Sequence, residues 1–132
     1  MAKHDKSGRS KHDAKHVRLY EVIEQTDAWR NLSGIAAKAW MSIGLMHNGA
    51  NNGSIAVSSR ELGTRIGVHY TTAASAIQEL INAGFLRRTK SSDFGRKRRA
   101  AEYVLTHLRN VITDEPATRD YVRSRAAPSI NQ

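Results

Sequence analysis

The sequence lacks cysteine, has only two prolines, and contains no uninterrupted apolar run of the length that a membrane span requires. Without cysteine there is neither a disulfide nor a zinc site with thiolate ligands. A transmembrane helix needs about 18 or more consecutive apolar residues, so we expect no membrane-spanning segment. The basic start of the chain has no apolar stretch resembling a signal peptide, and we therefore expect a cytoplasmic protein associated with the nucleoid.

Acidic residues are also scarce, because 12 Asp and Glu stand against 21 Lys and Arg, which gives a net charge of +9 and a pI near 10.4. A balance this basic favours polyanions such as DNA, RNA or an anionic membrane face, although a merely soluble basic protein has the same composition. Aromatic residues make up only 6% of the chain, and the sequence lacks paired exposed aromatics for stacking on single-stranded bases. Double-stranded DNA is therefore the expected partner.

Enzymatic motifs are missing as well. No glycine-rich loop ends in Gly-Lys-Ser/Thr, and no Gly-x-Ser-x-Gly turn is present. Glu61 and Glu79 are predicted to be surface charges on helices, and His69 lies at a helix start, where it suits capping or a phosphate contact better than proton transfer. His12 and His16 have no firm third ligand, which makes them a weak metal signal. We expect no catalysis, cofactor, metal or small-molecule substrate.

The 132 residues leave room for one domain with a modest core between two polar ends. Residues 1–16 have no apolar periodicity and are expected to form a flexible basic arm. Residues 17–107 are assigned to the folded domain. Residues 108–132 are expected to be a poorly packed tail or a short docking helix starting near Pro116, with the segment around Tyr121 as the surface for a second copy of the chain.

Apolar periodicity predicts helix over much of residues 17–46. The first part carries Leu19, Val22 and Ile23 at the spacing of one helical face. Ser33 is the expected N-cap of the second part, whose tryptophan lies on an apolar stripe and is therefore assigned to the core rather than to base stacking. That stripe consists of Ala36, Ala39, Trp40 and Ile43.

A short strand and another helix are expected next. Residues 54–57 alternate between polar and apolar side chains, as a strand does. The helix expected over residues 60–66 ends at Gly67. Gly63 on this helix has no side chain, which leaves room for a second helix to approach closely.

A second helix follows the turn at Gly67. It is expected to begin at His69 or Tyr70 and to end at Gly84, in the position of a C-terminal glycine cap. Two short helices joined by a glycine turn form a helix-turn-helix. The predicted buried stripe of the second helix consists of Ala73, Ile77 and Leu80.

A basic hairpin is expected after this helix. Two strands, residues 85–90 and 101–105, flank a turn-forming stretch at residues 91–95. Between Arg87 and Arg99, seven Lys or Arg stand against a single acidic residue. The order helix, strand, helix, turn, helix and hairpin predicts a winged helix-turn-helix: a mainly α chain with a small β-hairpin wing, in the α+β class.

Several of these segments resemble a known family. Residues 67–73 and 78–86, with the ending Glu-Leu-x-x-Ala-Gly-Phe-Leu, look like the recognition helix and the start of the wing in bacterial winged-helix regulators. Residues 28–53 are similar to helix-turn-helix proteins of mobile elements, prophages and plasmids. The resemblance covers roughly residues 17–106 and implies the winged-helix fold and DNA binding. The leading interpretation is a sequence-specific DNA-binding protein that regulates transcription of a mobile element, prophage or plasmid. The alternative is a replication-initiation or nucleoprotein-assembly factor that uses the same domain as a platform.

The second helix and the wing supply the expected DNA contacts. A helix in the major groove turns its outward face toward the base edges. Here that face carries small polar residues, where such helices often have Arg or Lys. Gln78 suits adenine and Thr71 a thymine methyl group, which favours A·T-containing sites. Because one such helix reads only a few base pairs, we expect a homodimer on a two-fold site. The expected base-contacting residues are His69, Tyr70, Thr71, Ala74, Ser75 and Gln78. The expected phosphate-contacting residues are Arg60, Thr72, Arg87, Arg88, Lys90, Arg96, Lys97, Arg98 and Arg99.

Overall fold

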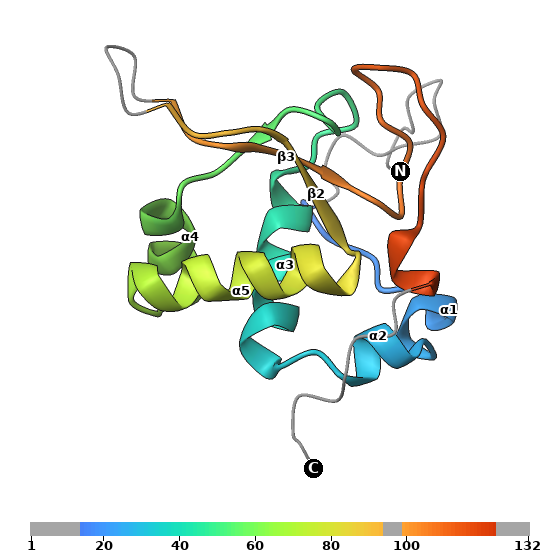
Figure 1. Cartoon of the computed structure of the whole chain (residues 1–132), viewed down its shortest axis with the longest axis horizontal. Helices are drawn as coiled ribbons and strands as arrows, with labels where there is room; N and C mark the ends of the chain where they lie inside the picture. The colour runs from blue at the N-terminus through green and yellow to red at the C-terminus, as the bar shows by residue number, and fades with distance from the viewer. Residues whose placement is uncertain (1–13, 94–98, 124–132) are drawn as a thin grey trace, which may run out of the picture.

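The computed structural model of the chain describes residues 14–93 and 99–123. In this part of the chain, five α-helices pack around a small antiparallel sheet of three strands, an α+β architecture compatible with a winged helix (Figure 1). The helices are α1 (Glu21–Glu24), α2 (Asp27–Arg30), α3 (Gly34–Met46), α4 (Ser59–Ile66) and α5 (Tyr70–Ala83), followed by a 3₁₀ helix, η1 (Asp120–Val122). The strands are β1 (Ile55–Ala56), β2 (Leu86–Lys90) and β3 (Glu102–Leu105).

The sheet has the order β1-β3-β2, with both neighbouring pairs antiparallel. The β2–β3 hairpin expected from the sequence is therefore present, and β1 adds a short third strand to its other edge. The register shifts between Arg88 and Lys90, which marks a bulge in β2. Beyond the strands, the Asp93 N–H donates to the Arg99 carbonyl at 2.8 Å, so the two arms stay paired toward the tip.

The ends of α3, α4 and α5 agree with local capping signals in the sequence. Ser33 caps α3 by accepting from the Ala36 N–H at 3.1 Å, as predicted. Ser58 caps α4, and His69 is the N-cap residue of α5. Gly67 and Gly84 end α4 and α5 with φ of +78° and +89°, which a residue with a Cβ adopts only under strain.

The core is built around four aromatic rings. Trp40 is fully buried, which confirms its assignment to the core. Its ring meets those of Trp29 and Phe85 edge to face, with centroids 5.4 and 6.3 Å apart. Tyr121 stacks flat on the other side of Phe85 at 4.9 Å. Aliphatic residues from α3, α4, α5 and the sheet fill the space around these rings.

The predicted helix over the first part of residues 17–46 was wrong. Two short helices, α1 and α2, replace it, and they meet at Thr26. The Thr26 hydroxyl donates to the Ile23 carbonyl at 2.7 Å and accepts from the Trp29 N–H at 3.1 Å, so it ends one helix and caps the next. Of the expected apolar face only Ile23 is buried, whereas Leu19 is 39% and Val22 71% exposed.

The segment after β3 also differs from the prediction. Tyr121, assigned to contact with a second subunit, is buried within its own chain at 4% exposure. Within residues 106–123 no helix starts near Pro116, and the helical structure there is the single turn of η1. The Arg119 N–H donates to the Thr106 carbonyl at 2.8 Å, and the backbone of Asp120 and Tyr121 lies against Gly84 at the end of α5. The described part of this segment thus contacts the domain through Thr106 and Tyr121, whereas residues 111–116 are exposed.

A buried amide joins the loop before β1 to the end of β3. The Asn52 side chain is fully buried, and its Oδ1 accepts from the Leu105 N–H at 2.7 Å. Its Nδ2 donates to the carbonyls of Leu105 and Arg109 at 3.1 and 2.8 Å. On the opposite strand of the hairpin, the Thr89 hydroxyl donates to the Gly53 carbonyl at 2.7 Å. Both strands of the hairpin are therefore hydrogen-bonded to the loop before β1.

Candidate nucleic-acid interface

The centre of the candidate interface is the pair of helices α4 and α5. They meet at Gly63, where an added Cβ would lie 2.7 Å from the Val68 carbonyl oxygen and 3.4 Å from the Tyr70 Cα. Both neighbours are backbone atoms, which cannot rotate away. The close approach expected at Gly63 is thus confirmed, and it fixes the angle between the two helices.

The outward face of α5 is polar and largely uncharged. Its apolar stripe of Ala73, Ile77 and Leu80 is buried, as predicted. On the opposite side, Tyr70, Thr71, Ala74, Ser75 and Gln78 are exposed, which matches the orientation that the sequence indicated. Thr72 is half-buried at the margin of this face.

Asn82, which was not among the predicted contact residues, extends the same face by one turn. It is exposed, and its Oδ1 accepts a hydrogen bond from the Gln78 Nε2 at 2.9 Å. The signal was available, because residue 82 continues the row of residues 71, 75 and 78 at the spacing of one helical face.

A stack of three side chains marks the first turn of α5. The His69 Nδ1 lies 2.9 Å from the Thr71 hydroxyl and 3.3 Å from the Thr71 N–H, in the position of a capping acceptor. The His69 and Tyr70 ring centroids are 4.5 Å apart. The guanidinium of Arg60, from the first turn of α4, lies 4.1 Å from the Tyr70 ring centroid. Arg60 is thereby held beside the start of α5, with its charge exposed.

Glu79, the only acidic residue of α5, does not face solvent freely as the sequence predicted. Its carboxylate accepts from the Ser33 N–H at 2.7 Å and from the Ser33 hydroxyl at 2.8 Å. It therefore ties α5 to the start of α3, and no carboxylate remains on the exposed face of α5. A surface charge was predicted because the partner lies 46 residues away in the sequence.

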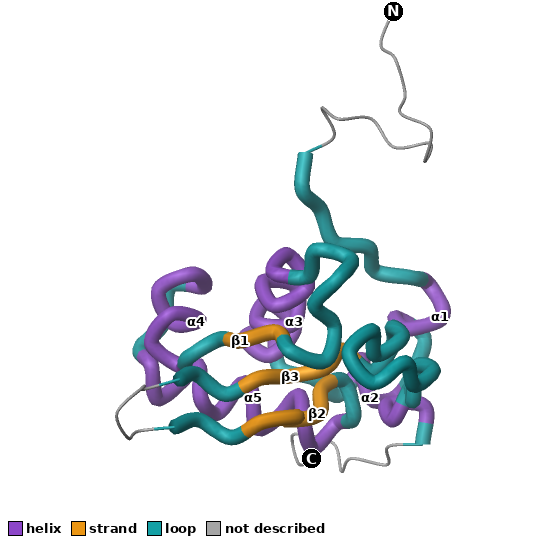
Figure 2. Tube along the Cα trace, turned by 90° about the horizontal axis from the view of Figure 1, so that it is seen from above, coloured by secondary structure: helices purple, strands orange, loops and turns teal. Residues whose placement is uncertain are grey.

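Exposed cations extend along the β2–β3 hairpin. Arg88, Lys90 and Arg99 are exposed; Arg88 lies 5.7 Å from the Tyr103 ring centroid, and Lys90 faces Glu102 across the strand pair. The predicted phosphate contacts Arg96, Lys97 and Arg98 lie outside the described residues. Figure 1 shows the outer end of the hairpin, α4 and the first turn of α5 together on the left of the molecule, an arrangement that Figure 2 shows from above.

Arg87 stands apart from this group of cations. Its guanidinium donates to both carboxylate oxygens of Asp120, at 2.6 and 2.9 Å, at the end of β2 that lies away from the hairpin tip. The hydrogen bond from Arg87 lowers the pKa of Asp120, and the same bond raises the pKa of Arg87. The predicted phosphate contact at this position is thus occupied by a partner within the chain.

Two other kinds of site are absent from residues 14–93 and 99–123. No group of three His, Asp or Glu side chains there is arranged to hold a metal ion. No helix in the same ranges is long and apolar enough to cross a membrane. Comparison of the chain with family models, curated proteins and solved structures gave no match.

Proposed function

We propose that this chain is a winged helix-turn-helix protein that binds double-stranded DNA. In this proposal α5 enters the major groove with its outward face toward the base edges, and the β2–β3 hairpin is the wing that lies along the flanking phosphates. No catalytic step belongs to this function. As a sequence-specific DNA-binding protein it would act on the nucleoid, as a transcriptional regulator of a mobile element, prophage or plasmid.

The observation that carries the proposal is the exposed face of α5, which is free of acidic side chains and has exposed cations on the neighbouring helix α4 and hairpin. Arg60 lies at one border, and Arg88, Lys90 and Arg99 lie on the neighbouring hairpin. DNA repels carboxylates and attracts such cations through its phosphates. Because Glu79 is bound to Ser33, the helix presents only neutral hydrogen-bonding and methyl groups. That combination suits base edges in the centre and phosphates at the rim.

The side chains on this face also favour sequence-specific binding over a purely electrostatic contact. The Gln78 amide carries a donor and an acceptor that match adenine, and Thr71 and Ala74 supply methyl groups that match thymine. The hydrogen bond between Gln78 and Asn82 limits the freedom of the Gln78 amide before DNA arrives. Less rotamer entropy is then lost on binding.

The phosphate contacts are tested by the dependence of affinity on salt. Each phosphate neutralised adds about −0.9 to the slope of log K against log salt. A variant with Arg88→Ala, Lys90→Ala and Arg99→Ala should bind a random duplex more weakly and with a slope shallower by about 2 to 3. Fluorescence anisotropy over a salt series measures both quantities, and circular dichroism checks that the variant is folded.

Arg87→Ala is the matched control, since it removes a cation from the same strand that is already bound to Asp120. Its salt slope should equal that of the parent. The proposal is overturned if the parent shows a nearly flat salt dependence, or if the folded triple variant binds as tightly as the parent. A loss with Arg87→Ala of about one third of that in the triple variant would mean that only net charge matters, which also contradicts a wing.

Base recognition is tested by selection from a random DNA pool. Gln78→Ala and Thr71→Ala should each cost roughly 1–3 kcal/mol at the selected site and relax the preference at one or two base pairs. Gln25→Ala, an exposed change at the end of α1, should leave the selected motif unaltered. Recovery of the parental motif with equal stringency from both α5 variants would remove α5 from base recognition.

Genome-wide occupancy then addresses the role of the bound protein. A few sharp sites at promoters support the regulator, in line with the base-matching side chains of α5. One cluster resembling an origin would replace it with a replication-initiation or nucleoprotein-assembly factor.

A further inference from the structure

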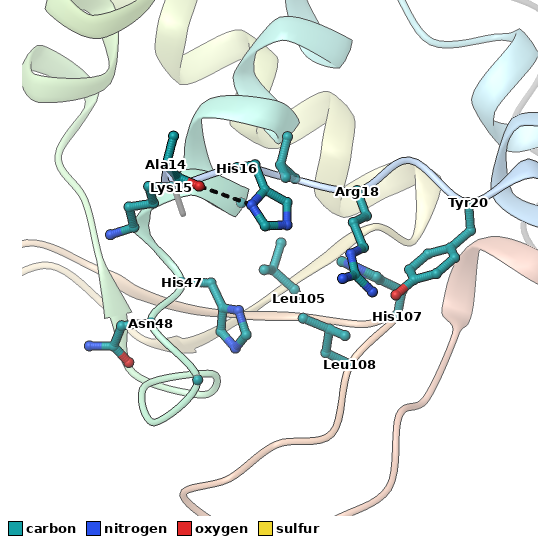
Figure 3. A pocket seen from close by; sticks show the side chains of 13 residues that line it. Ala14, Lys15, His16, Arg18, Tyr20, His47, Asn48, Leu105, His107 and Leu108 are labelled. Carbon is teal, nitrogen blue, oxygen red and sulfur yellow. Dashed lines mark hydrogen bonds between the residues drawn. The ribbon is translucent and has the colours of Figure 1, made fainter. Parts of the chain in front are cut away.

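A cavity of about 710 Å³ lies on the far side of α3 from α5 (Figure 3). Three separate stretches of the chain line it: residues 14–20, the end of α3 with residues 47–49, and residues 105–108. Figure 2 shows the segment before α1 and helix α5 on opposite sides of α3. The volume falls within the range of small-molecule sites, about 300–1,000 Å³. The proposed DNA-binding face makes no use of this cavity.

The side chains that line the cavity include five basic residues, beside the neutral polar groups of Tyr20 and Asn48. Lys15 and Arg18 bring permanent positive charges, and His16, His47 and His107 bring imidazoles. None of the described lining residues is Asp or Glu. In Figure 3, Lys15, His16 and Arg18 extend from one wall, and His47 lies across the cavity from them. The arrangement has donors and positive charges but no carboxylate to neutralise them.

Two of the imidazoles are held neutral by these surroundings. Burial, with smaller effects from His47 and Arg119, lowers the pKa of His107 to about 4. Burial and the Lys15 ammonium lower the pKa of His47. The buried His107 Nδ1 also has no hydrogen-bond partner in the described part of the chain. An anion in the cavity would relieve the repulsion between cations and favour the protonated imidazoles.

We propose that this cavity binds a phosphate group, held mainly by Lys15 and Arg18 with support from the histidines. Arg and Lys are the side chains that bind phosphate most often, the first by paired hydrogen bonds and the second as a point charge. The apolar side chains of Val17, Leu105 and Leu108 line the remainder of the cavity and suit the organic part of a phosphorylated small molecule. The same chemistry also fits a backbone phosphate of a second DNA segment.

The full chain is titrated with inorganic pyrophosphate in a calorimeter, without DNA, so that the result is independent of the proposed DNA binding. The parent should bind, and Lys15→Gln combined with Arg18→Gln should raise the dissociation constant about tenfold or more, because two charge-assisted contacts are lost. Both residues are exposed, so the variant should stay folded. Lys38→Gln, an exposed cation on α3 outside the cavity, is the matched control and should bind as the parent does.

Binding should also tighten between pH 8 and pH 6, with uptake of protons by His47 and His107. The charged groups that lower their pKa values are Lys15, which acts on His47, and Arg119, which acts on His107, and Arg18 lines the same cavity. All three are cations, so in the free protein they oppose imidazole protonation, and a bound phosphate reverses that balance. Calorimetry in two buffers of different ionisation enthalpy measures the protons taken up.

The two sources of phosphate are distinguished with a short random duplex. If the double variant loses pyrophosphate but binds the duplex as the parent does, the ligand is a small phosphorylated molecule. If duplex affinity and salt slope fall as well, the cavity takes a DNA phosphate. The inference is overturned if the parent does not bind pyrophosphate, if the double variant binds it unchanged, or if Lys38→Gln weakens binding equally.

Discussion

Replacing Asn52 by alanine tests how the hairpin is fastened to the rest of the domain. The side chain makes three hydrogen bonds to the end of β3 and the loop after it, and it is fully buried. Truncation removes them without altering any surface residue. A loss of stability from this change therefore measures the internal attachment of the hairpin.

The three bonds are not equivalent in the variant. The Leu105 carbonyl keeps a donor, because the Leu108 N–H lies 3.2 Å from it. Arg109 is exposed, so water reaches its carbonyl more readily. The Leu105 N–H, however, loses its 2.7 Å acceptor in a buried position. One orphaned buried donor costs about 1–3 kcal/mol, and with the small cavity left by truncation we expect a loss of about 2–4 kcal/mol.

Urea unfolding followed by circular dichroism measures this change, with Asn48→Ala as the control. Asn48 is exposed in the same loop, and its loss should cost less than about 1 kcal/mol. Asn52→Asp should be worse than Asn52→Ala near neutral pH, since it turns a negative charge toward two carbonyls, and its deficit should shrink in acid. If Asn52→Ala and Asn48→Ala unfold at the same urea concentration, the buried amide does not secure the hairpin.

Three further results are expected. His107 resists protonation down to about pH 4 in the fold but accepts a proton near pH 6.5 when unfolded, so stability present above pH 6.5 should be lost as pH falls toward 4. This loss amounts to about 2–3 kcal/mol in phosphate-free buffer; an equally steep pH profile in His107→Gln would contradict this origin. Gly63→Ala should cost about 1–3 kcal/mol in urea unfolding because its Cβ meets backbone, whereas Gly34→Ala, with open space around it, should be nearly neutral; equal effects would exclude the close helix contact. Tyr121→Ala should lower stability by about 3–5 kcal/mol by leaving a cavity beside Phe85, and light scattering before and after the change should show the same mass, since this ring faces its own core; dissociation of a dimer without destabilisation would restore Tyr121 to a subunit contact.

The helices α4 and α5 and the hairpin were predictable because their signals are local. The capping residues of these helices act within one turn of the helix ends; they are Ser58, His69, Gly67 and Gly84. The spacing of Ala73 and Leu80 marks an apolar stripe that is buried whichever element packs against it. These short-range features determined the outward face of α5 before any tertiary contact was known. The same locality explains why Gly63 pointed to a close helix contact.

Contacts between distant parts of the chain decided the rest. Glu79 and Arg87 look like solvent-facing charges until folding brings Ser33 and Asp120 to them. Tyr121 stands in a polar stretch with weak periodicity, and only the flat face of Phe85 explains its burial. Asn52 is similarly a residue type typical of turns, yet its side chain forms a hydrogen bond with the Leu105 N–H of β3, 53 residues away.

Tertiary structure also made the cationic cavity, which joins stretches separated by up to about 90 residues. Sequence fixes the charge of each lining side chain, but burial and the approach of other cations decide whether a histidine carries a proton. Those two effects depend on distances through space, which helical spacing and capping motifs do not encode. The α4–α5 pair and its outward face were thus determined by local sequence, whereas the cationic cavity depends on tertiary contacts between distant stretches of the chain.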